Sequence, residues 1–423
     1  ANEMLYCAII LLFSFSGNVK ELSGLTIMHS ITKSFPYEVP TCWAEHFTKC
    51  RPGAGRLKLG NLPTPIHVLE GSKFQEYSLL RILHQVNITM FIKRDDMSGG
   101  PEMGGNKIRK LEFLLADALD KKCDSVVTIG GEQSNHCRAT ACAARLVGLE
   151  PHLILRRTKK KIPVKSPAIV QEEEDETLGL TGNILYNRIV GSTIHTCTSG
   201  EYGRFGSVAL IDLVCSSLRG VRNPYPIPVG GSNALGTWGY IEGVNELVTQ
   251  LSDQQVDHVV VATGSGGTLA GITIGLDMYS RSSSQQRPIV HAVGVCDNPD
   301  YFYRKLEEIV EEIGYSSFDK LNIRDWVNIY QGRGLGYALS TTEELEFIQQ
   351  FAECTGIALD PVYTGKALYH FINNVEQNPN KFLNSQVLFW HTGGSVGLHE
   401  RNGELMTTLK QSSPVNRLRV YGK

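Results

Sequence analysis

The chain has 423 residues, of which 42% are hydrophobic and 20% are charged, and its formal net charge is −2. This composition is ordinary for a soluble globular protein, and the length suits two packed units better than one simple core. The nearly balanced charge gives no reason to expect a nucleic-acid partner. The ten cysteines include no Cys-x-x-Cys pair and no zinc-ligand spacing, so we interpret them as intracellular thiols.

The first 56 residues are the least informative part of the sequence. An apolar run over residues 5–15 has the length of a signal-peptide core, but no positive charge precedes it and it is too short to span a bilayer. The first arginine is Arg51, so an arginine-rich transit peptide is not evident. We therefore predict an N-terminal extension over residues 1–56, either unstructured or a targeting segment, and no membrane span.

Glycines at positions 104 and 105 precede a helical pattern that begins at Lys107. One face of this helix is predicted from a spacing of four, three and four residues, in Lys107, Leu111, Leu114 and Ala118. Polar residues are expected on the solvated side, namely Arg109, Lys110, Glu112 and Asp117. A desolvated lysine suits Schiff-base chemistry with a carbonyl cofactor. By this segment alone, however, a lysine that extends its charge to solvent from the helix start is the better interpretation.

A β-branched run at residues 125–129 predicts a buried strand, which ends in Gly-Gly-Glu-Gln-Ser-Asn at 130–135. An alanine-rich helix is predicted next, over residues 138–146. Ser134 and Asn135 are reasonable N-cap residues for this helix, and groups at a helix N-terminus also suit a cofactor or a substrate carboxylate. Cys137 and Cys142 are expected to be packing residues.

Two charged runs predict a solvated loop in the middle of the chain. The basic run at residues 156–161 is followed by an acidic run at residues 172–176. Blocks of like charge are usually solvated. We therefore expect neither run to reach the site.

A second glycine-rich turn follows the strand predicted at residues 258–262. Its sequence is Thr-Gly-Ser-Gly-Gly-Thr at 263–268, and a helix follows. Small residues let backbone N–H groups approach an anion, and the hydroxyl groups add donors, so a phosphate fits. A dinucleotide loop is disfavoured because Leu269 stands where the third glycine should be, and a Walker A loop lacks its Gly-Lys-Ser/Thr. A single phosphate is the better interpretation.

Alternating strand and helix signals predict an α/β fold with parallel sheets. The strands are expected near residues 91–96, 125–129, 152–155, 258–262, 289–295 and 386–390. Tyr363 precedes a helix predicted to start near Thr364, and the residues alone favour a core aromatic there.

Five motifs occur in a fixed order along the chain. They are Gly-Gly-Asn-Lys at 104–107, Gly-Gly-Glu-Gln-Ser-Asn at 130–135, Thr-Gly-Ser-Gly-Gly-Thr at 263–268, Asp-Pro-Val-Tyr-Thr-Gly-Lys at 360–366 and His-Thr-Gly-Gly at 391–394. Together they resemble the pyridoxal-phosphate enzymes of the tryptophan-synthase-β fold. Within that group the chain is similar to the branch of D-cysteine desulfhydrases and 1-aminocyclopropane-1-carboxylate (ACC) deaminases, from about Leu57 to about Glu400.

This resemblance implies pyridoxal 5'-phosphate as the cofactor. Lys107 would form the Schiff base, and Asn135 would hydrogen-bond the ring hydroxyl. Thr392 would lie near the ring nitrogen. The phosphate would be cradled by Thr263, Gly264, Ser265, Gly266, Gly267 and Thr268.

The resemblance also implies a small amino acid as the substrate. Gln133 and Ser134 would contact its carboxylate, with Ser134 also near the α-carbon. Tyr337, Tyr363 and Thr364 would line the substrate side. The implied catalytic residues are Lys107, Ser134 and Tyr363.

Two positions distinguish the members of this branch. ACC deaminases carry glutamate after the motif tyrosine and leucine after the late histidine, where this chain has Thr364 and Thr392, as D-cysteine desulfhydrases do. A carboxylate near the ring nitrogen favours its protonation, which ring opening requires, whereas hydrosulfide leaves more easily. We therefore predict β-elimination of D-cysteine to pyruvate, hydrogen sulfide and ammonia, with ACC deamination as the alternative.

The resemblance further implies how the chain is divided. A large domain would comprise residues 57–107 and 222–404, a smaller domain of residues 108–221 would be inserted into it, and residues 405–423 would form a tail. The cofactor would lie in the cleft between the two domains. By the same resemblance we expect a homodimer and a mitochondrial location, with a cytoplasmic location as the alternative.

Two functions of other classes remain as alternatives. A nicotinamide-dependent oxidoreductase would use the loop at Gly264 but leaves Lys107 unexplained. A catalytically silent relative would bind the cofactor or act as a scaffold. The presence of Lys107, Ser134 and Tyr363 argues against such a silent relative.

Overall fold

The computed structural model describes residues 31–157, 178–252, 254–283, 286–316, 323–400 and 409. The predicted extension up to residue 30, most of the predicted charged loop and nearly all of the predicted tail lie outside these ranges. The elements described below belong to one compact unit that begins at Thr32. Each helix in these ranges is too short or too polar to cross a membrane.

The larger sheet has six strands in the order β1-β2-β10-β7-β8-β9. All neighbours run parallel except β1, which is antiparallel to β2. The central strand β7 is buried along its whole length, as expected for a parallel sheet covered on both faces. The strands are β1 (Ile66–Leu69), β2 (Thr89–Arg94), β7 (His258–Thr263), β8 (Ile289–Gly294), β9 (Val327–Gln331) and β10 (Gln386–His391).

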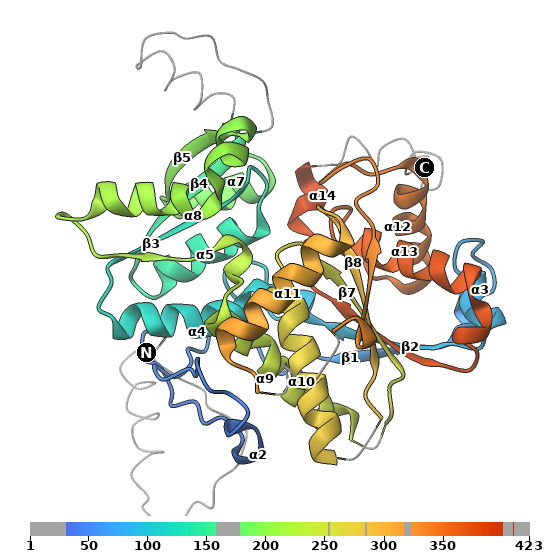
Figure 1. Cartoon of the computed structure of the whole chain (residues 1–423). Helices are drawn as coiled ribbons and strands as arrows, with labels where there is room; N and C mark the ends of the chain where they lie inside the picture. The colour runs from blue at the N-terminus through green and yellow to red at the C-terminus, as the bar shows by residue number, and fades with distance from the viewer. Residues whose placement is uncertain are drawn as a thin grey trace, which may run out of the picture. The chain divides into compact units, whose positions relative to one another are not determined.

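Helices cover both faces of this sheet. Alternate residues of β7 point to opposite faces, so its apolar side chains pack against the helices on each side. Val259 and Val261 pack with α9 (Ala234–Leu251), α10 (Gly267–Ser283) and α11 (Pro299–Ile313). Val260 and Ala262 pack on the other side. That face is covered by α3 (Arg81–Gln85), α12 (Thr342–Thr355) and α13 (Thr364–Gln377), as Figure 1 shows.

The smaller sheet has four parallel strands in the order β5-β4-β3-β6. They are β3 (Ser125–Gly131), β4 (Glu150–Arg157), β5 (Thr193–Thr198) and β6 (Pro224–Pro226). Val126 and Leu153 face α4 (Lys107–Asp120), α5 (Asn135–Leu146) and α7 (Gly182–Ile189). The opposite face packs against α8 (Ser199–Leu218).

These two sheets confirm the predicted α/β class, and each predicted strand exists. The sequence did not indicate β1, β5, β6 and β9, which are short or have mixed exposure and so lack a clear apolar run. The remaining short α-helices of the described residues are α2 (Thr41–Ala44) and α14 (Val396–Glu400). The limits given for the two domains and the tail stay a prediction.

The expectation of a solvated polar side on α4 was wrong. Arg109, Lys110 and Glu112 are each only 1% exposed. Glu112 accepts hydrogen bonds from the backbone N–H groups of Leu59 and Gly60. Polar partners from distant parts of the chain bury this side, and helical spacing alone does not reveal them.

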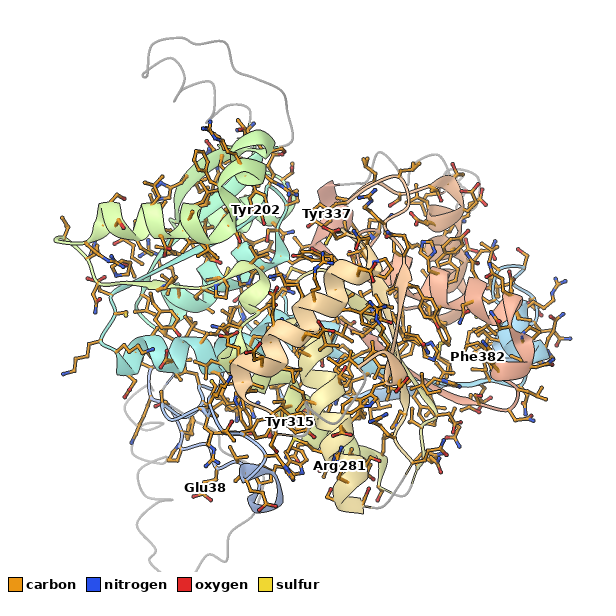
Figure 2. The ribbon with its side chains drawn as sticks, viewed as in Figure 1. Glu38, Tyr202, Arg281, Tyr315, Tyr337 and Phe382 are labelled. Atoms are coloured by element: carbon orange, nitrogen blue, oxygen red, sulfur yellow. The ribbon has the colours of Figure 1, made fainter. Side chains whose placement is uncertain are left out.

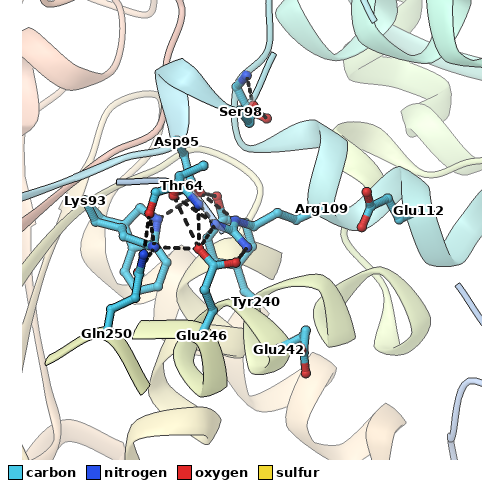
Figure 3. A network of polar contacts seen from close by, with 12 residues as sticks. Thr64, Lys93, Asp95, Ser98, Arg109, Glu112, Tyr240, Glu242, Glu246 and Gln250 are labelled. Carbon is cyan, nitrogen blue, oxygen red and sulfur yellow. Dashed lines mark hydrogen bonds and ion pairs between the residues drawn. The ribbon is translucent and has the colours of Figure 1, made fainter. Parts of the chain in front are cut away.

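Arg109 lies in a buried network of paired charges (Figure 3). It donates to Asp95 (2.9 Å from Nη2 to Oδ1) and to Glu246 (2.8 Å from Nη2 to Oε1). Asp95 also accepts from the hydroxyl of Tyr240 and the indole N–H of Trp390. Burial alone would raise the pKa of Asp95, but the Arg109 guanidinium holds it below its usual value. The network joins α4 to α9 and to β2 and β10 two residues beyond Lys107.

Candidate active site

A cavity of about 450 Å³ lies where the carboxyl ends of parallel strands meet the starts of helices. This volume falls in the range of about 300–1,000 Å³ found for small-molecule sites. Eleven of the predicted site residues line it: Lys107, Ser134, Asn135, Thr263, Gly264, Ser265, Gly266, Thr268, Tyr337, Tyr363 and Thr392. The structure therefore brings together motifs that lie far apart in the sequence.

Three predicted site residues are not among those that line the cavity. Gln133 accepts from the backbone N–H of Asn183 (2.8 Å) and donates to the carbonyl of Thr181. Thr364 is fully buried, and its Oγ1 donates to Oδ1 of Asp360 (2.7 Å). Gly267 is the first residue of α10. The motifs identified the correct segments, but they could not show which side chains turn into the protein.

Lys107 begins α4 and lines the cavity. Its Nζ donates to Oδ1 of Asn106 (3.0 Å), and no carboxylate among the described residues pairs with it. Burial lowers the pKa of Lys107 to about 8, with a further lowering from the charge of Arg138 and an opposing effect of Asp360. The uncharged amine, which a nucleophilic lysine requires, is therefore far more populated near neutral pH than in an ordinary lysine.

The close approach of two segments fixes the start of α4. The N–H of Asn106 donates to the carbonyl of Thr392 (3.0 Å). Gly105 has a φ of +106°, and a Cβ there would lie 3.2 Å from the same carbonyl oxygen. Gly104 and Gly105 therefore let the backbone turn into α4 close to the end of β10.

Lys110 is a residue of this site that the sequence interpretation missed. It is buried, and its Nζ donates to the carbonyl of Gly230 and to Oγ of Ser232, both at 3.1 Å. Ser232 contacts the hydroxyl of Ser265 (2.8 Å) and accepts from the N–H of Gly267. Burial, and then the charge of Lys107, lowers the pKa of Lys110 well below its ordinary value. Its position three residues after Lys107, on the same helical face, was the signal available in the sequence.

The turn from β7 to α10 has the geometry of an anion site. Gly266 has a φ of +88°, and a Cβ on Gly264 would lie 3.0 Å from a ring carbon of Tyr363. Both positions therefore favour glycine. The N-terminus of the 17-residue α10 follows directly, where free N–H groups favour a phosphate. Thr268 accepts from the side-chain amide of Asn106 (3.2 Å).

Two buried oxygen atoms on the cavity wall have no hydrogen-bond partner in the described part of the chain. They are Oδ1 of Asn135 and Oγ1 of Thr263. Leaving a buried polar atom unsatisfied costs about 1–3 kcal/mol. A ligand with a ring hydroxyl and a phosphate would supply partners for both, so these residues fit pyridoxal phosphate.

Ser134 can serve both as the N-cap of α5 and as a ligand-binding residue of the cavity. Its Oγ accepts from the N–H of Cys137 (3.2 Å) and so caps α5, as the sequence predicts. It also lines the cavity, and its hydroxyl proton is not used by that cap. Cys137 and Cys142 are buried, and burial raises the pKa of both thiols, which agrees with their predicted packing role.

Tyr337 and Tyr363 form a pair in the cavity. Their hydroxyl oxygens are 2.8 Å apart, and their rings meet edge to face at 6.2 Å. Burial, and then the neighbouring Tyr337, raises the pKa of Tyr363 well above its usual value, and burial also raises the pKa of Tyr337. Both phenols are therefore protonated at neutral pH. One hydroxyl donates to the other, which leaves one proton free for a ligand.

Arg156 also lines the cavity, contrary to its predicted place in a solvated loop. Its guanidinium lies over the rings of Tyr202 (5.0 Å) and Tyr337 (5.7 Å), and the two tyrosines come from α8 and from the segment after β9 (Figure 2). The Nε of Arg156 is buried without a partner among the described residues. A charge run in the sequence does not show that its first member belongs to a buried strand.

Known proteins share this architecture and sequence. A model of the family described as pyridoxal-phosphate dependent enzymes matches residues 58–393. Over 380 residues the chain is 42% identical to the mitochondrial bifunctional D-cysteine desulfhydrase/1-aminocyclopropane-1-carboxylate deaminase of Arabidopsis thaliana, which covers 88% of this chain and 86% of that protein.

Solved structures agree with this assignment. The crystal structure of an ACC deaminase homologue has a TM-score of 0.66 at 30% identity, covering 88% of this chain and 99% of that one. A fungal L-serine ammonia-lyase from Rhizomucor miehei has a TM-score of 0.55 at 17% identity, over 82% of this chain and 98% of the other, and shows the fold alone. The chain therefore belongs to the family of pyridoxal-phosphate dependent enzymes and uses pyridoxal 5'-phosphate as its cofactor.

Proposed function

We propose that this enzyme is a D-cysteine desulfhydrase, which converts D-cysteine and water to pyruvate, hydrogen sulfide and ammonia. The observation that carries the proposal is Thr392. It lines the cavity directly after β10, where the family resemblance places the ring nitrogen of the cofactor. A hydroxyl group there leaves that nitrogen neutral, which suits the loss of a good leaving group such as hydrosulfide.

The residues of the cavity divide the work of holding the cofactor. Lys107 would attach it, Asn135 would bond its ring hydroxyl, and residues 263–268 would bind its phosphate. Lys110, hydrogen-bonded to Ser232 behind this turn, would add positive charge once the negative charge of the bound phosphate favours its protonated form. When bound, pyridoxal phosphate supplies the electron sink that stabilises negative charge at the α-carbon.

Side chains around the substrate would transfer the protons, namely Lys107 and the Tyr337–Tyr363 pair. Lys107, with its pKa lowered to about 8, supplies an amine that can accept the α-proton. Ser134 lies on the cavity wall at the start of α5, where the helix N-terminus favours the substrate carboxylate. The free hydroxyl proton of the Tyr337–Tyr363 pair is available to the departing sulfur.

ACC deamination is the second candidate, since the Arabidopsis relative is named for both activities. The structure keeps Thr364 away from the cavity, so a hydroxyl at that position does not by itself decide between the two reactions. From the same relative and the family resemblance we also propose a mitochondrial location and a homodimer. Organelle fractionation and sedimentation would test these two proposals.

The decisive test supplies the purified holoenzyme with D-cysteine, L-cysteine and ACC. Sulfide and pyruvate should form from D-cysteine much faster than from L-cysteine, and 2-oxobutanoate should form slowly or not at all from ACC. A clear preference for L-cysteine would sink the proposal. Deamination of ACC at the rate of D-cysteine breakdown would replace it with a bifunctional enzyme.

A further inference from the structure

Lys366 is a motif residue that neither the cofactor nor the substrate explains. It lies in the first turn of α13, its side chain is fully buried, and it is not among the residues that line the cavity. Its Nζ donates to the carbonyls of Arg333 (3.1 Å) and Leu339 (2.7 Å) and lies 3.0 Å from Oε2 of Glu344. Two of its three acceptors are therefore main-chain oxygens of one loop.

That loop, residues 332–341, connects β9 to α12 and carries Tyr337. Much of it is exposed, with Leu335 at 69% and Leu339 at 52%. Gly334 has a φ of +56°, and a Cβ there would lie 3.1 Å from Nζ of Lys366, so the backbone packs directly on the ammonium. A buried charge thus holds from inside an exposed loop that is also fastened by the bond from Ser340 to the carbonyl of Pro361 and by the tyrosine pair.

The start of α13 positions both tyrosines of the pair, Tyr363 through the chain and Tyr337 through Lys366. Tyr363 immediately precedes α13, and Lys366 follows it by three residues. The carbonyls that Lys366 binds flank Tyr337 on both sides, and the hydroxyl of Tyr337 is 2.8 Å from that of Tyr363. Glu344, the carboxylate partner, is itself fixed by the capping box at the start of α12.

We propose that Lys366 is a positioning residue that fixes the loop of residues 332–341 so that the hydroxyl of Tyr337 meets that of Tyr363. The loop geometry stands by itself, and the consequence for catalysis rests on the proposed function. Without the ammonium, three acceptors lose their shared donor, and the loop keeps few contacts that define one position.

Hydrogen exchange of the holoenzyme tests the geometry directly. In Lys366→Met, the amides of residues 333–341 should exchange at least about tenfold faster, while β7 and β10 stay protected. Lys381→Met, which removes an exposed lysine beyond α13, is the matched control and should exchange like the wild type. Unchanged exchange in the loop would overturn the proposal. If Lys366→Met does not fold, Gly334→Ala decides, because its Cβ and its strained φ push the loop off Lys366.

A double-mutant cycle tests the consequence for the reaction. Lys366→Met should lower kcat/KM for D-cysteine about 10–100-fold, the effect of a misplaced catalytic group. In the background of Tyr337→Phe the same change should have little further effect. Full additivity would show that Lys366 does not act through Tyr337. A wild type that releases no sulfide would refute the proposed function, and the exchange result would still decide the role of Lys366.

Discussion

Helix α4 carries buried basic side chains on two sides, and they have carboxylate partners on one side but not on the other. On one side Arg109 has two carboxylate partners, Asp95 and Glu246, and every charge in that network is matched by another. On the side toward the cavity, Lys107 and Lys110 bond only to neutral oxygens of the described residues. The paired side holds the helix in place. The unpaired side keeps two desolvated lysines with lowered pKa values, which a covalent bond and a phosphate would satisfy.

This contrast explains how a costly arrangement is tolerated. An unpaired ammonium in a protein interior is unfavourable, and it persists only where the surrounding structure is strong enough to hold it. The network of Figure 3 lies two residues from Lys107 and ties α4 to β2, α9 and β10. We therefore expect changes on the two sides of α4 to affect different quantities, stability on one and cofactor chemistry on the other.

The largest effect is expected at Lys107. Lys107→Ala should abolish turnover and the visible absorbance of the bound cofactor, because the amine that attaches it is gone. Cofactor held by the phosphate turn alone should wash out on gel filtration. A variant that keeps an absorbance band reducible by borohydride would show that another lysine is the anchor, and Lys110 would be the first to examine.

On the paired side, Arg109→Met should lower the free energy of unfolding by about 3–5 kcal/mol, because it leaves Asp95 and Glu246 buried with too little positive charge. Denaturant unfolding of the apoprotein measures this. Lys121→Met is the matched control, since it breaks an exposed pair with Asp117 at the end of the same helix and should change stability by under about 1 kcal/mol. Equal losses in the two variants would contradict the contrast.

On the unpaired side, Lys110→Met should weaken the binding of pyridoxal phosphate about 10–100-fold without lowering the stability of the apoprotein. The bound phosphate favours the protonated form of Lys110, so the variant loses a charge that acts on the phosphate. The apoprotein loses only a desolvated lysine that has no carboxylate partner among the described residues. Binding of pyridoxal, which has no phosphate, should change little, and the ratio of the two affinities is the measurement. A similar loss for both ligands would mean that Lys110 only shapes the turn around Ser232.

Helix α4 also shows which structural features could be predicted from the sequence and which could not. The fold class and the place of Lys107 at the start of a helix follow from periodicity and from short motifs, because both depend on neighbours in the chain. The partners of Arg109 and Glu112, the buried place of Lys110 and the turning of Thr364 toward Asp360 depend on segments far away. Arg156 was misplaced for the same reason, since its cavity neighbours Tyr202 and Tyr337 lie 46 and 181 residues further along the chain.

The last expected effect is a pH dependence of stability that belongs to Lys107. Its pKa is lowered to about 8 in the folded protein, whereas an unfolded lysine titrates near about 10.4. Between these values the unfolded chain binds more protons, so the free energy of unfolding of the apoprotein should rise with pH across this window. Below about pH 8 both states are protonated, and the full penalty of the buried charge remains. Lys107→Met removes this contribution, so the stability advantage of the variant over the wild type should shrink as pH rises from 8 to 10. An advantage that is independent of pH would mean that Lys107 titrates normally, and the contrast between the two sides of α4 would then rest on Lys110 alone.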